Sequence, residues 1–266
     1  IKGVFIMFQK KIIVITGASS GVGRELACLF ASKGAQVVLL ARNVEKLAEL
    51  QRQINIEGGS ADYYSLDITD INSIRLIFEK IVLRFQHIDI LINCAGVGKF
   101  QFFSEMGSDV IDQMLAVNVH GLIHCTQAAL PSMVRQKHGC IVNIASLAGI
   151  ITTSKSVVYG ATKHAVIGFS NGLRMETLKD GIRVIVVNPG PIRTPFLNIA
   201  DPSGHYLKNA GRFMLDARTV AEKVISGIEK NKREINLPWY MGIGAKLYQL
   251  MPGVFEKIFG RIINMK

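Results

Sequence analysis

A tyrosine and a lysine that could exchange a proton lie one helical turn apart in the segment YGATK, residues 159–163. Residues four positions apart are neighbours on one face of a helix, so we expect Tyr159 and Lys163 to lie close together. A nearby ammonium group stabilises a phenolate, which predicts a Tyr159 pKa below its usual value of about 10. Such a tyrosine could act as a general acid or base near neutral pH, although the same spacing also occurs in ordinary surface pairs.

Two further polar residues precede this pair. Ser146 directly follows an apolar run, 140–144, that is typical of a strand. Asn118 lies in a mostly apolar helical segment, where a buried amide needs hydrogen-bond partners. Asn118 is therefore a candidate site residue, and the alternative is a structural amide that bends the helix.

A glycine-rich turn, TGASSGVG at residues 16–23, separates the apolar run 11–16 from a helical segment at 24–32. Glycines let the backbone turn sharply and approach a pyrophosphate, and the following helix N-terminus provides N–H groups and the positive end of its dipole. The position of the turn, between a first strand and a first helix, predicts a dinucleotide site; an ordinary turn is the alternative.

The end of the second apolar run predicts which dinucleotide binds. An acidic residue there would bind the 2′-hydroxyl of NAD. This segment, LLARN at residues 39–43, has no acidic residue and contains Arg42 instead. A guanidinium group suits a phosphate, so the sequence favours NADP(H) over NAD(H). A solvated surface charge is the alternative interpretation of Arg42.

The elements that must position these residues alternate regularly. Apolar runs at 11–16, 36–40, 63–66, 88–92, 140–144 and 183–187 are separated by helical patterns near 70–85, 109–136 and 156–178. Continuous apolar strands that alternate with helices predict an α/β fold, a doubly wound Rossmann domain whose parallel sheet has helices on both faces. The composition, 49% hydrophobic and 19% charged over 266 residues, suits a globular chain, and the absence of a linker predicts one domain over residues 7–266. We expect a substrate lid near 193–215 and amphipathic helices over 239–265.

Together these motifs resemble the short-chain dehydrogenase/reductase family in its single-domain form. The resemblance rests on the turn at 16–23, the NCAG sequence at 93–96, Asn118, Ser146, the Tyr159/Lys163 pair and the PGPIRT sequence at 189–194. It covers residues 12–195. Cys94 departs from the second Asn of the family's NNAG turn, which puts the sheet-bracing role of that amide in doubt.

The resemblance implies a cofactor-binding set, and it implies no metal. The implied cofactor residues are Gly17, Ser19, Ser20, Gly21, Val22, Gly23, Arg42, Asp67, Asn93, Ala95, Gly96, Tyr159, Lys163, Pro189, Gly190, Ile192 and Thr194. Within this set Ser19, Ser20 and Arg42 would face the adenosine ribose phosphate, and Asp67 would bind the adenine amino group.

The resemblance also implies a catalytic set: Asn118, Ser146, Tyr159 and Lys163. Hydride transfer would occur between the nicotinamide and a carbonyl or alcohol carbon. Tyr159 would exchange the proton, Ser146 would hold the substrate oxygen, Lys163 would tune Tyr159, and Asn118 would position a water molecule.

Aromatic and aliphatic residues fill the segments expected to contact substrate, at 97–105, 147–157 and 195–215. They favour a lipophilic small-molecule substrate, with packing of the lid as the alternative. A 3-oxoacyl thioester reductase of fatty-acid synthesis and a non-catalytic NADP(H)-binding regulator are the competing functions. Intact catalytic positions count against the regulator, and the long lid and tail count against the thioester reductase.

The net charge of +11 is spread along the chain without interleaved aromatic residues, so we expect no nucleic-acid partner. The C-terminal stripe from Leu247 to Ile263 is expected to pack on the domain or on a partner subunit, with peripheral contact to an anionic membrane as the sharper alternative. We expect a homodimer or homotetramer. Lys10 and Lys11 interrupt the first apolar stretch, unlike a signal peptide, so a cytoplasmic location is expected, with membrane association as an option.

Overall fold

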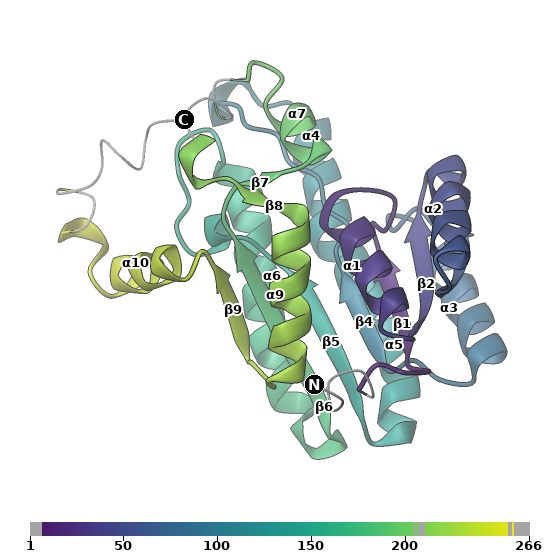
Figure 1. Cartoon of the computed structure of the whole chain (residues 1–266). Coiled ribbons are helices and arrows are strands. Elements are labelled where there is room, and N and C mark those ends of the chain that lie inside the picture. The colour runs from purple at the N-terminus through teal and green to yellow at the C-terminus, as the bar shows by residue number, and fades with distance from the viewer. Residues whose placement is uncertain (1–6, 205, 207–210, 255–256, 258–266) are drawn as a thin grey trace.

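A seven-stranded parallel sheet forms the centre of the computed structural model, which describes residues 7–204, 206, 211–254 and 257 (Figure 1). The strand order is β3-β2-β1-β4-β5-β6-β9, and every pair in this sheet is parallel. The strands are β1 (Ile12–Thr16), β2 (Gln36–Ala41), β3 (Ser60–Ser65), β4 (Ile90–Asn93), β5 (Gly139–Ile144), β6 (Ile182–Pro189) and β9 (Glu234–Leu237).

Helices cover both faces of this sheet. Successive residues of each strand point to opposite sides, and apolar side chains on both sides need to be buried. Ile13 and Ile15 of β1 pack in the core beneath α1 (Gly21–Ser32), α2 (Val44–Ile56) and α9 (Ala217–Glu229). Ile12 and Val14 pack in the core on the other face, beneath α3 (Ile71–Phe85), α5 (Leu122–Gln136) and α6 (Val157–Glu176). The predicted doubly wound Rossmann architecture is confirmed.

Local signals explain several element boundaries. Asn43 accepts the N–H of Lys46 at 2.7 Å and so caps α2, as its residue type predicts. Asp70 likewise accepts the N–H groups of Asn72 and Ser73 at the start of α3. The smaller elements are α4 (Ser108–Leu115), α7 (Pro195–Ala200), α10 (Trp239–Leu250), the short turns η1 (Phe103–Glu105), η3 (Leu147–Gly149), η4 (Leu178–Asp180) and η5 (Gly211–Phe213), and the paired strands β7 (Ile192–Arg193) and β8 (Leu215–Asp216).

Three features differ from the sequence-based expectation. The helical pattern expected over 109–136 is divided by a π-helical turn, η2 (Ala116–Gly121). The expected irregular lid contains α7, and its residues 205 and 207–210 lie outside the described part of the chain. The expected final helix pair is separated by β9, a strand of four residues with one buried side chain, Ile235, which is too short to give a clear pattern.

A buried carboxylate, Asp89, connects strands at the amino-terminal side of the sheet. Asp89 is 4% exposed. Its Oδ2 accepts the backbone N–H of Ile12 at 2.8 Å, and its Oδ1 accepts from Lys11 Nζ at 2.8 Å. This contact joins the starts of β1 and β4. Strands β2 and β3 are added on one side of this pair and β5, β6 and β9 on the other.

We predict that Asp89→Ala lowers the free energy of unfolding by about 2 kcal/mol, because it leaves the buried N–H of Ile12 without an acceptor. Urea denaturation measures the change as a lower midpoint at unchanged m-value. Asp112→Ala, which removes an exposed carboxylate from α4, is the matched control and should stay near the wild-type midpoint. Equal midpoints for the two variants would contradict this role of Asp89.

Candidate active site

The glycine-rich turn lies between β1 and α1 at the carboxyl edge of the sheet (Figure 1). Gly17 has a φ of +69°, and a Cβ at this position would lie 2.7 Å from the Cα of Ala95. A Cβ at Gly23 would lie 2.4 Å from the carbonyl oxygen of Gly17. These positions therefore accept only glycine. The first turn of α1, which is described throughout, holds no acidic residue, and Ser20 makes no side-chain capping bond. The helix N-terminus thus offers an anion site.

A threonine that sequence reasoning passed over joins this turn to β4. Thr16 Oγ1 accepts the backbone N–H groups of Cys94 at 3.1 Å and Ala95 at 3.2 Å. A hydroxyl residue that ends an otherwise apolar strand was the available signal. The bond holds the turns after β1 and β4 together, where the crevice of a doubly wound sheet opens.

An amide network braces the sheet below these turns. Asn93 Nδ2 donates to Thr126 Oγ1 at 2.9 Å and to Asn143 Oδ1 at 2.8 Å. Asn143 Nδ2 donates in turn to Ser170 Oγ at 2.8 Å. Asn93 and Asn143 are register partners on β4 and β5. They connect the strands with helices α5 and α6. Burial raises the pKa of the neighbouring Cys94 thiol to about 11.

The π-helical turn η2 places Asn118 beside the segment that follows β4. Its Oδ1 accepts the N–H of Val97 at 2.8 Å. Its Nδ2 donates to the carbonyl of Val97 at 2.8 Å and to Thr162 Oγ1 at 3.0 Å. A Cβ at Gly96 would lie 3.4 Å from Asn118 Oδ1 and 3.5 Å from Lys163 Nζ. Residue 96 therefore lies within van der Waals distance of both groups.

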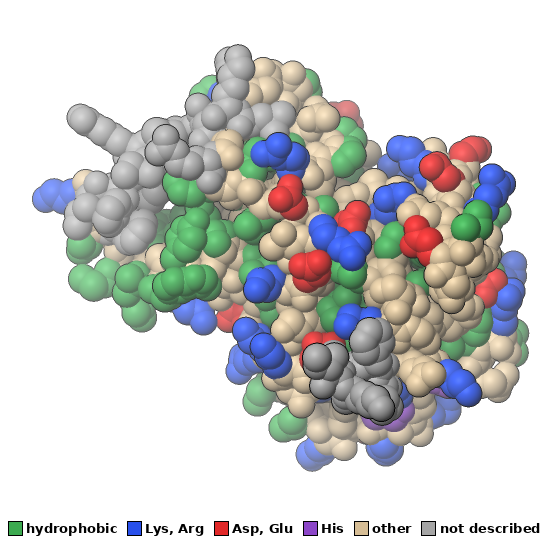
Figure 2. All heavy atoms as spheres, viewed as in Figure 1, with side chains coloured by type: hydrophobic (Ala, Val, Ile, Leu, Met, Phe, Trp, Pro, Cys, Tyr) green, Lys and Arg blue, Asp and Glu red, His purple; other side chains and the backbone are tan. Residues whose placement is uncertain are grey.

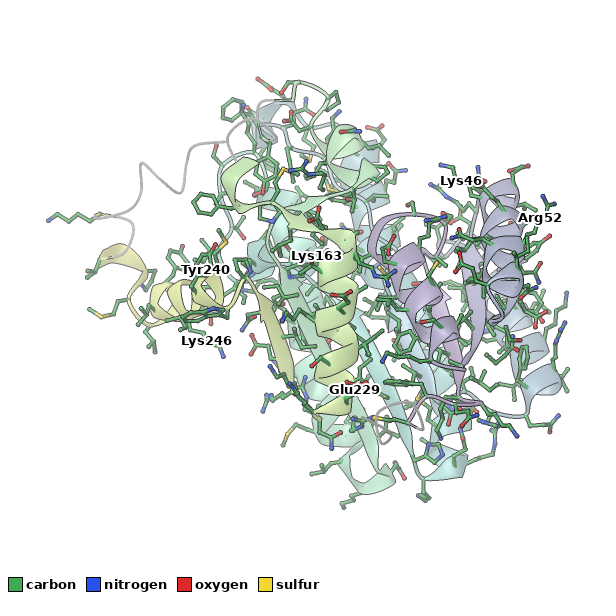
Figure 3. All side chains as sticks on the ribbon, viewed as in Figure 1. Lys46, Arg52, Lys163, Glu229, Tyr240 and Lys246 are labelled. Carbon is green, nitrogen blue, oxygen red and sulfur yellow. The ribbon has the colours of Figure 1, made fainter. Side chains whose placement is uncertain are left out.

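Tyr159 and Lys163 lie on α6 as the spacing predicts, with Lys163 Nζ 5.8 Å from the centroid of the Tyr159 ring. Ser146 lies close enough to the Tyr159 phenol to lower its pKa, and its hydroxyl donates to the carbonyl of Pro189 at 3.4 Å. Lys163 Nζ donates to the carbonyl of Ile144 at 2.9 Å and is labelled in Figure 3. The structure thus brings the four predicted catalytic side chains to one edge of the sheet.

The predicted lowering of the Tyr159 pKa is wrong for this structure. Burial raises the pKa of Tyr159 well above its usual value, and the hydrogen bond from Ser146 offsets only part of the rise. Burial also lowers the pKa of Lys163 to about 8. The low-dielectric surroundings disfavour both charged forms, and this effect outweighs the attraction expected from the one-turn spacing. Tyr159 is therefore a protonated phenol at neutral pH.

Aromatic rings surround Tyr159. Phe100 packs edge-on against it with centroids 5.9 Å apart, and Phe196 of α7 lies 5.7 Å away. Tyr206 packs against Phe100 at 5.0 Å. The backbone N–H of Phe100 donates to the carbonyl of Ala200 at 2.8 Å, which ties the segment after β4 to α7. Phe102, Phe103 and Phe213, from the same predicted substrate segments, are instead exposed.

The end of β2 carries more positive charge than the sequence interpretation named. Arg42 is largely exposed, and its Nη1 lies 3.9 Å from Asp67 Oδ2. Lys46, in the first turn of α2, is also exposed and lies at the same end of that helix (Figure 3). The sequence interpretation rests on Arg42 alone, although the cap at Asn43 places Lys46 in the first helical turn.

The segment after β6 completes this edge. Gly190 donates its N–H to the carbonyl of Leu237 at 2.6 Å, so β9 fixes its position. Thr194 precedes α7, and a Cβ at Gly21 would lie 3.1 Å from its methyl group. Thr194 therefore closes against the glycine-rich turn. The predicted segments 16–23, 93–96 and 189–194 meet around the space that Gly96 borders.

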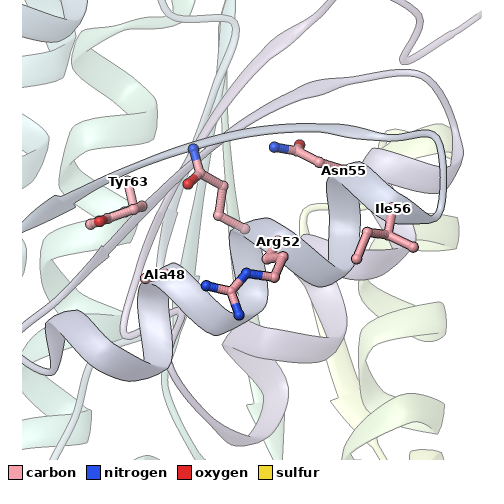
Figure 4. A pocket seen from close by; sticks show the side chains of 6 residues that line it. Ala48, Arg52, Asn55, Ile56 and Tyr63 are labelled. Carbon is pink, nitrogen blue, oxygen red and sulfur yellow. The ribbon is translucent and has the colours of Figure 1, made fainter.

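A separate shallow hollow of about 550 Å³ lies on the outer part of α2 and β3 (Figure 4). It is lined by Ala48, Gln51, Arg52, Asn55, Ile56 and Tyr63. None of the predicted site residues lines it. We assign it no role in the chemistry.

Known proteins that are similar to this chain include oxidoreductases. The family model described as short chain dehydrogenase matches residues 11–202. An uncharacterized oxidoreductase of Staphylococcus epidermidis is 33% identical over 217 residues, which cover 82% of this chain and 90% of the relative. An uncharacterized oxidoreductase of Staphylococcus saprophyticus is 35% identical over 223 residues, covering 84% and 92%.

Solved structures with bound dinucleotides share the fold. A short-chain dehydrogenase/reductase from Burkholderia phymatum in complex with NAD superposes with a TM-score of 0.85 at 25% identity, over 91% of this chain and 94% of that one. An alcohol dehydrogenase from Thermococcus sibiricus complexed with 5-hydroxy-NADP superposes with a TM-score of 0.76 at 26% identity, over 85% and 94%. The chain belongs to the short-chain dehydrogenase/reductase family of oxidoreductases.

Proposed function

We propose that this chain is an NADP(H)-dependent reductase of a lipophilic carbonyl compound, acting through Asn118, Ser146, Tyr159 and Lys163. The observation that carries the proposal is the Tyr159 hydroxyl. It is buried beside Ser146 and between the rings of Phe100 and Phe196. A phenol that stays protonated and has a hydroxyl neighbour is suited to give a proton to a carbonyl oxygen.

The cofactor cradle fits a dinucleotide phosphate, because close backbone contacts at Gly17 and Gly23 leave no room for side chains beside the N-terminus of α1. In this proposal residues 17 and 19–23 hold the pyrophosphate, and Asp67 binds the adenine. Asn93, Ala95 and Gly96 line the nicotinamide side, together with Pro189, Gly190, Ile192 and Thr194 of the segment after β6. Bound NADPH supplies the hydride.

The protein's own contribution is proton transfer and orientation. Ser146 holds the substrate oxygen, and Tyr159 gives its proton to that oxygen as negative charge develops. Lys163, held by the carbonyl of Ile144, places an ammonium group beside the phenol. Asn118 fixes the Val97 backbone and thereby the wall facing Lys163.

The aromatic surroundings of Tyr159 favour a lipophilic substrate. Phe100 and Phe196 leave the phenol facing apolar surface, on which a sugar or polyol would leave its hydroxyl groups without partners. A panel of aliphatic, aromatic and steroid ketones and 3-oxoacyl thioesters, assayed by NADPH and NADH fluorescence, tests the proposal. Turnover of the hydrophobic ketones is expected, and NADPH binding without turnover of any carbonyl would instead support a regulator.

We predict that Arg42 selects NADPH through the 2′-phosphate of the adenosine ribose. Arg42→Asp should weaken NADPH binding more than tenfold, about 1.4 kcal/mol, and leave NADH affinity unchanged or higher. Titration of cofactor fluorescence measures both constants. Arg52→Asp makes the same charge change on the outer part of α2 (Figure 4) and is the matched control. Lys46→Asp measures the contribution of the second cation at this edge. Equal NADPH affinities for Arg42→Asp and Arg52→Asp would refute the selection by Arg42.

Lys163 should control the alkaline limb of carbonyl reduction. Its pKa is lowered to about 8, so the ammonium form is complete near pH 6 and is lost as the pH rises through 8. The raised pKa of Tyr159 keeps the phenol protonated over this range. We therefore expect kcat/KM for reduction to be level below pH 7 and to fall about tenfold per pH unit above 8.

A pH–rate series on wild type and on Lys163→Met checks this expectation. The variant should be slow at every pH and should lack the break near pH 8. Lys137→Met, which removes a surface lysine paired with Asp180, should keep the wild-type profile. A wild-type profile that stays level to pH 10 would exclude Lys163 as the titrating group.

A further inference from the structure

Helix α10 extends away from the sheet and exposes an apolar face, to which Val254 adds just beyond its end (Figure 1). Seven of the 21 large apolar side chains that the described part of the chain exposes lie within 16 residues: Trp239, Tyr240, Ile243, Leu247, Leu250, Met251 and Val254. We call these seven side chains the α10 face. Figure 2 shows hydrophobic side chains gathered in the region of α10. Patches of this kind mark interaction sites.

The opposite side of α10 is fixed to the body of the protein. A Cβ at Gly242 would lie 2.4 Å from the Cβ of Asn236 on β9, and Ala245 is buried. Lys246 forms an ion pair with Glu234 at 3.4 Å. Because these contacts set the rotation of the helix, the α10 face points outward in a defined direction. Leu247, Leu250, Met251 and Val254, the described part of the expected stripe, do not pack on the domain. The expectation that the stripe packs on a partner subunit stays a prediction. The rest of the stripe, at 255, 258–259 and 262–263, lies outside the described residues.

The packed side of α10 contacts the candidate active site. A Cβ at Gly190 would lie 3.5 Å from Met241 Sδ of α10. The helix also contacts the turn η3, which follows Ser146 directly. The α10 face thus lies on the outer side of a helix whose inner side touches the segments near Tyr159.

Two chemical properties favour a lipid surface as that partner. Trp239 and Tyr240 pack edge-on at the first turn with centroids 6.1 Å apart, and such amphipathic rings prefer the boundary between lipid and water (Figure 3 labels Tyr240). Residues 238–266 contain four basic residues and one acidic residue, and the whole chain has a net charge of +11. Apolar area and positive charge act together at anionic membranes.

No helix among the described residues is long and apolar enough to cross a membrane. A helix of 12 residues such as α10 has a length of about 18 Å, shorter than the hydrocarbon core of a bilayer. Contact in the plane of the interface is the arrangement that these dimensions allow. We propose that the α10 face docks peripherally on an anionic lipid bilayer, so that α10 lies between the bilayer and the segments near Tyr159.

Trp239 is the single tryptophan of the chain, so its fluorescence reports directly on this face. We expect its emission to shift to shorter wavelength when full-length protein meets phosphatidylcholine vesicles containing 30% phosphatidylglycerol. Brominated lipid should quench it, and about 0.5 M salt should reverse most of the binding, because the Debye length then shrinks to a few ångström. The measurement needs neither cofactor nor substrate, so its outcome is independent of the proposed reaction.

Two sets of variants keep the test specific. The double variant Leu247→Glu/Leu250→Glu should lower the vesicle-bound fraction at least tenfold in co-sedimentation. Leu83→Glu, on the exposed surface of α3, makes the same change elsewhere and should bind as wild type. Lys257→Glu, at an exposed position beyond α10, should weaken binding to anionic vesicles while leaving the apolar side chains of the α10 face in place. Circular dichroism confirms that each variant folds.

Several outcomes would overturn the proposal. One is an unshifted Trp239 emission with intact wild-type protein on anionic vesicles. Another is equal binding by Leu247→Glu/Leu250→Glu and Leu83→Glu. A third is a shift that occurs without vesicles and follows protein concentration, with light scattering showing association through the α10 face, which would assign that face to a second copy of the chain.

Discussion

The close approach of two backbone turns, at Gly17 after β1 and at Ala95 after β4, is the constraint on which the rest of the site depends. The Cα of Ala95 lies where a side chain of residue 17 would begin, and Thr16 Oγ1 binds the N–H groups of Cys94 and Ala95. The phosphate cradle and the wall of the reaction site therefore form one rigid unit. Gly96 follows at once and borders Asn118 and Lys163, so a shift of either turn would change the distance between the glycine-rich turn and these two side chains.

Residue type and spacing predicted the architecture because long, strongly apolar strands and capped helices carry their pattern locally. The glycine-rich turn, the Tyr159/Lys163 pair and Arg42 were likewise recognisable from the sequence. Two features were not. β9 is four residues long, and η2 interrupts a helical pattern without any glycine or proline before Gly121. β9 is defined by its pairing with β6, a strand far away in the chain, which a local pattern does not encode. Lys46, in contrast, was within reach of the sequence through the cap at Asn43.

The pKa values of the site residues also could not be predicted from a local sequence pattern. A spacing of four residues indicates that a phenol and an ammonium group are neighbours, but it contains no information on burial. In the folded chain Phe100 and Phe196 flank Tyr159, and burial raises the pKa of Tyr159 and lowers that of Lys163. In the proposed reaction, the apolar surroundings that would favour a lipophilic substrate also keep Tyr159 in the protonated form that reduction requires. The proposal thus derives substrate choice and acid chemistry from one set of aromatic contacts.

The role of Tyr159 as proton donor is the centre of this account, and Tyr159→Phe tests it most directly because it keeps the ring and removes the proton. Turnover of an identified ketone and NADPH affinity should be measured side by side for wild type, Tyr159→Phe and Tyr206→Phe, the last being the neighbouring tyrosine on the same aromatic cluster. The account predicts that Tyr159→Phe loses turnover by roughly 100-fold or more with NADPH affinity within a few-fold of wild type, while Tyr206→Phe stays active. Turnover by Tyr159→Phe close to that of wild type would contradict it.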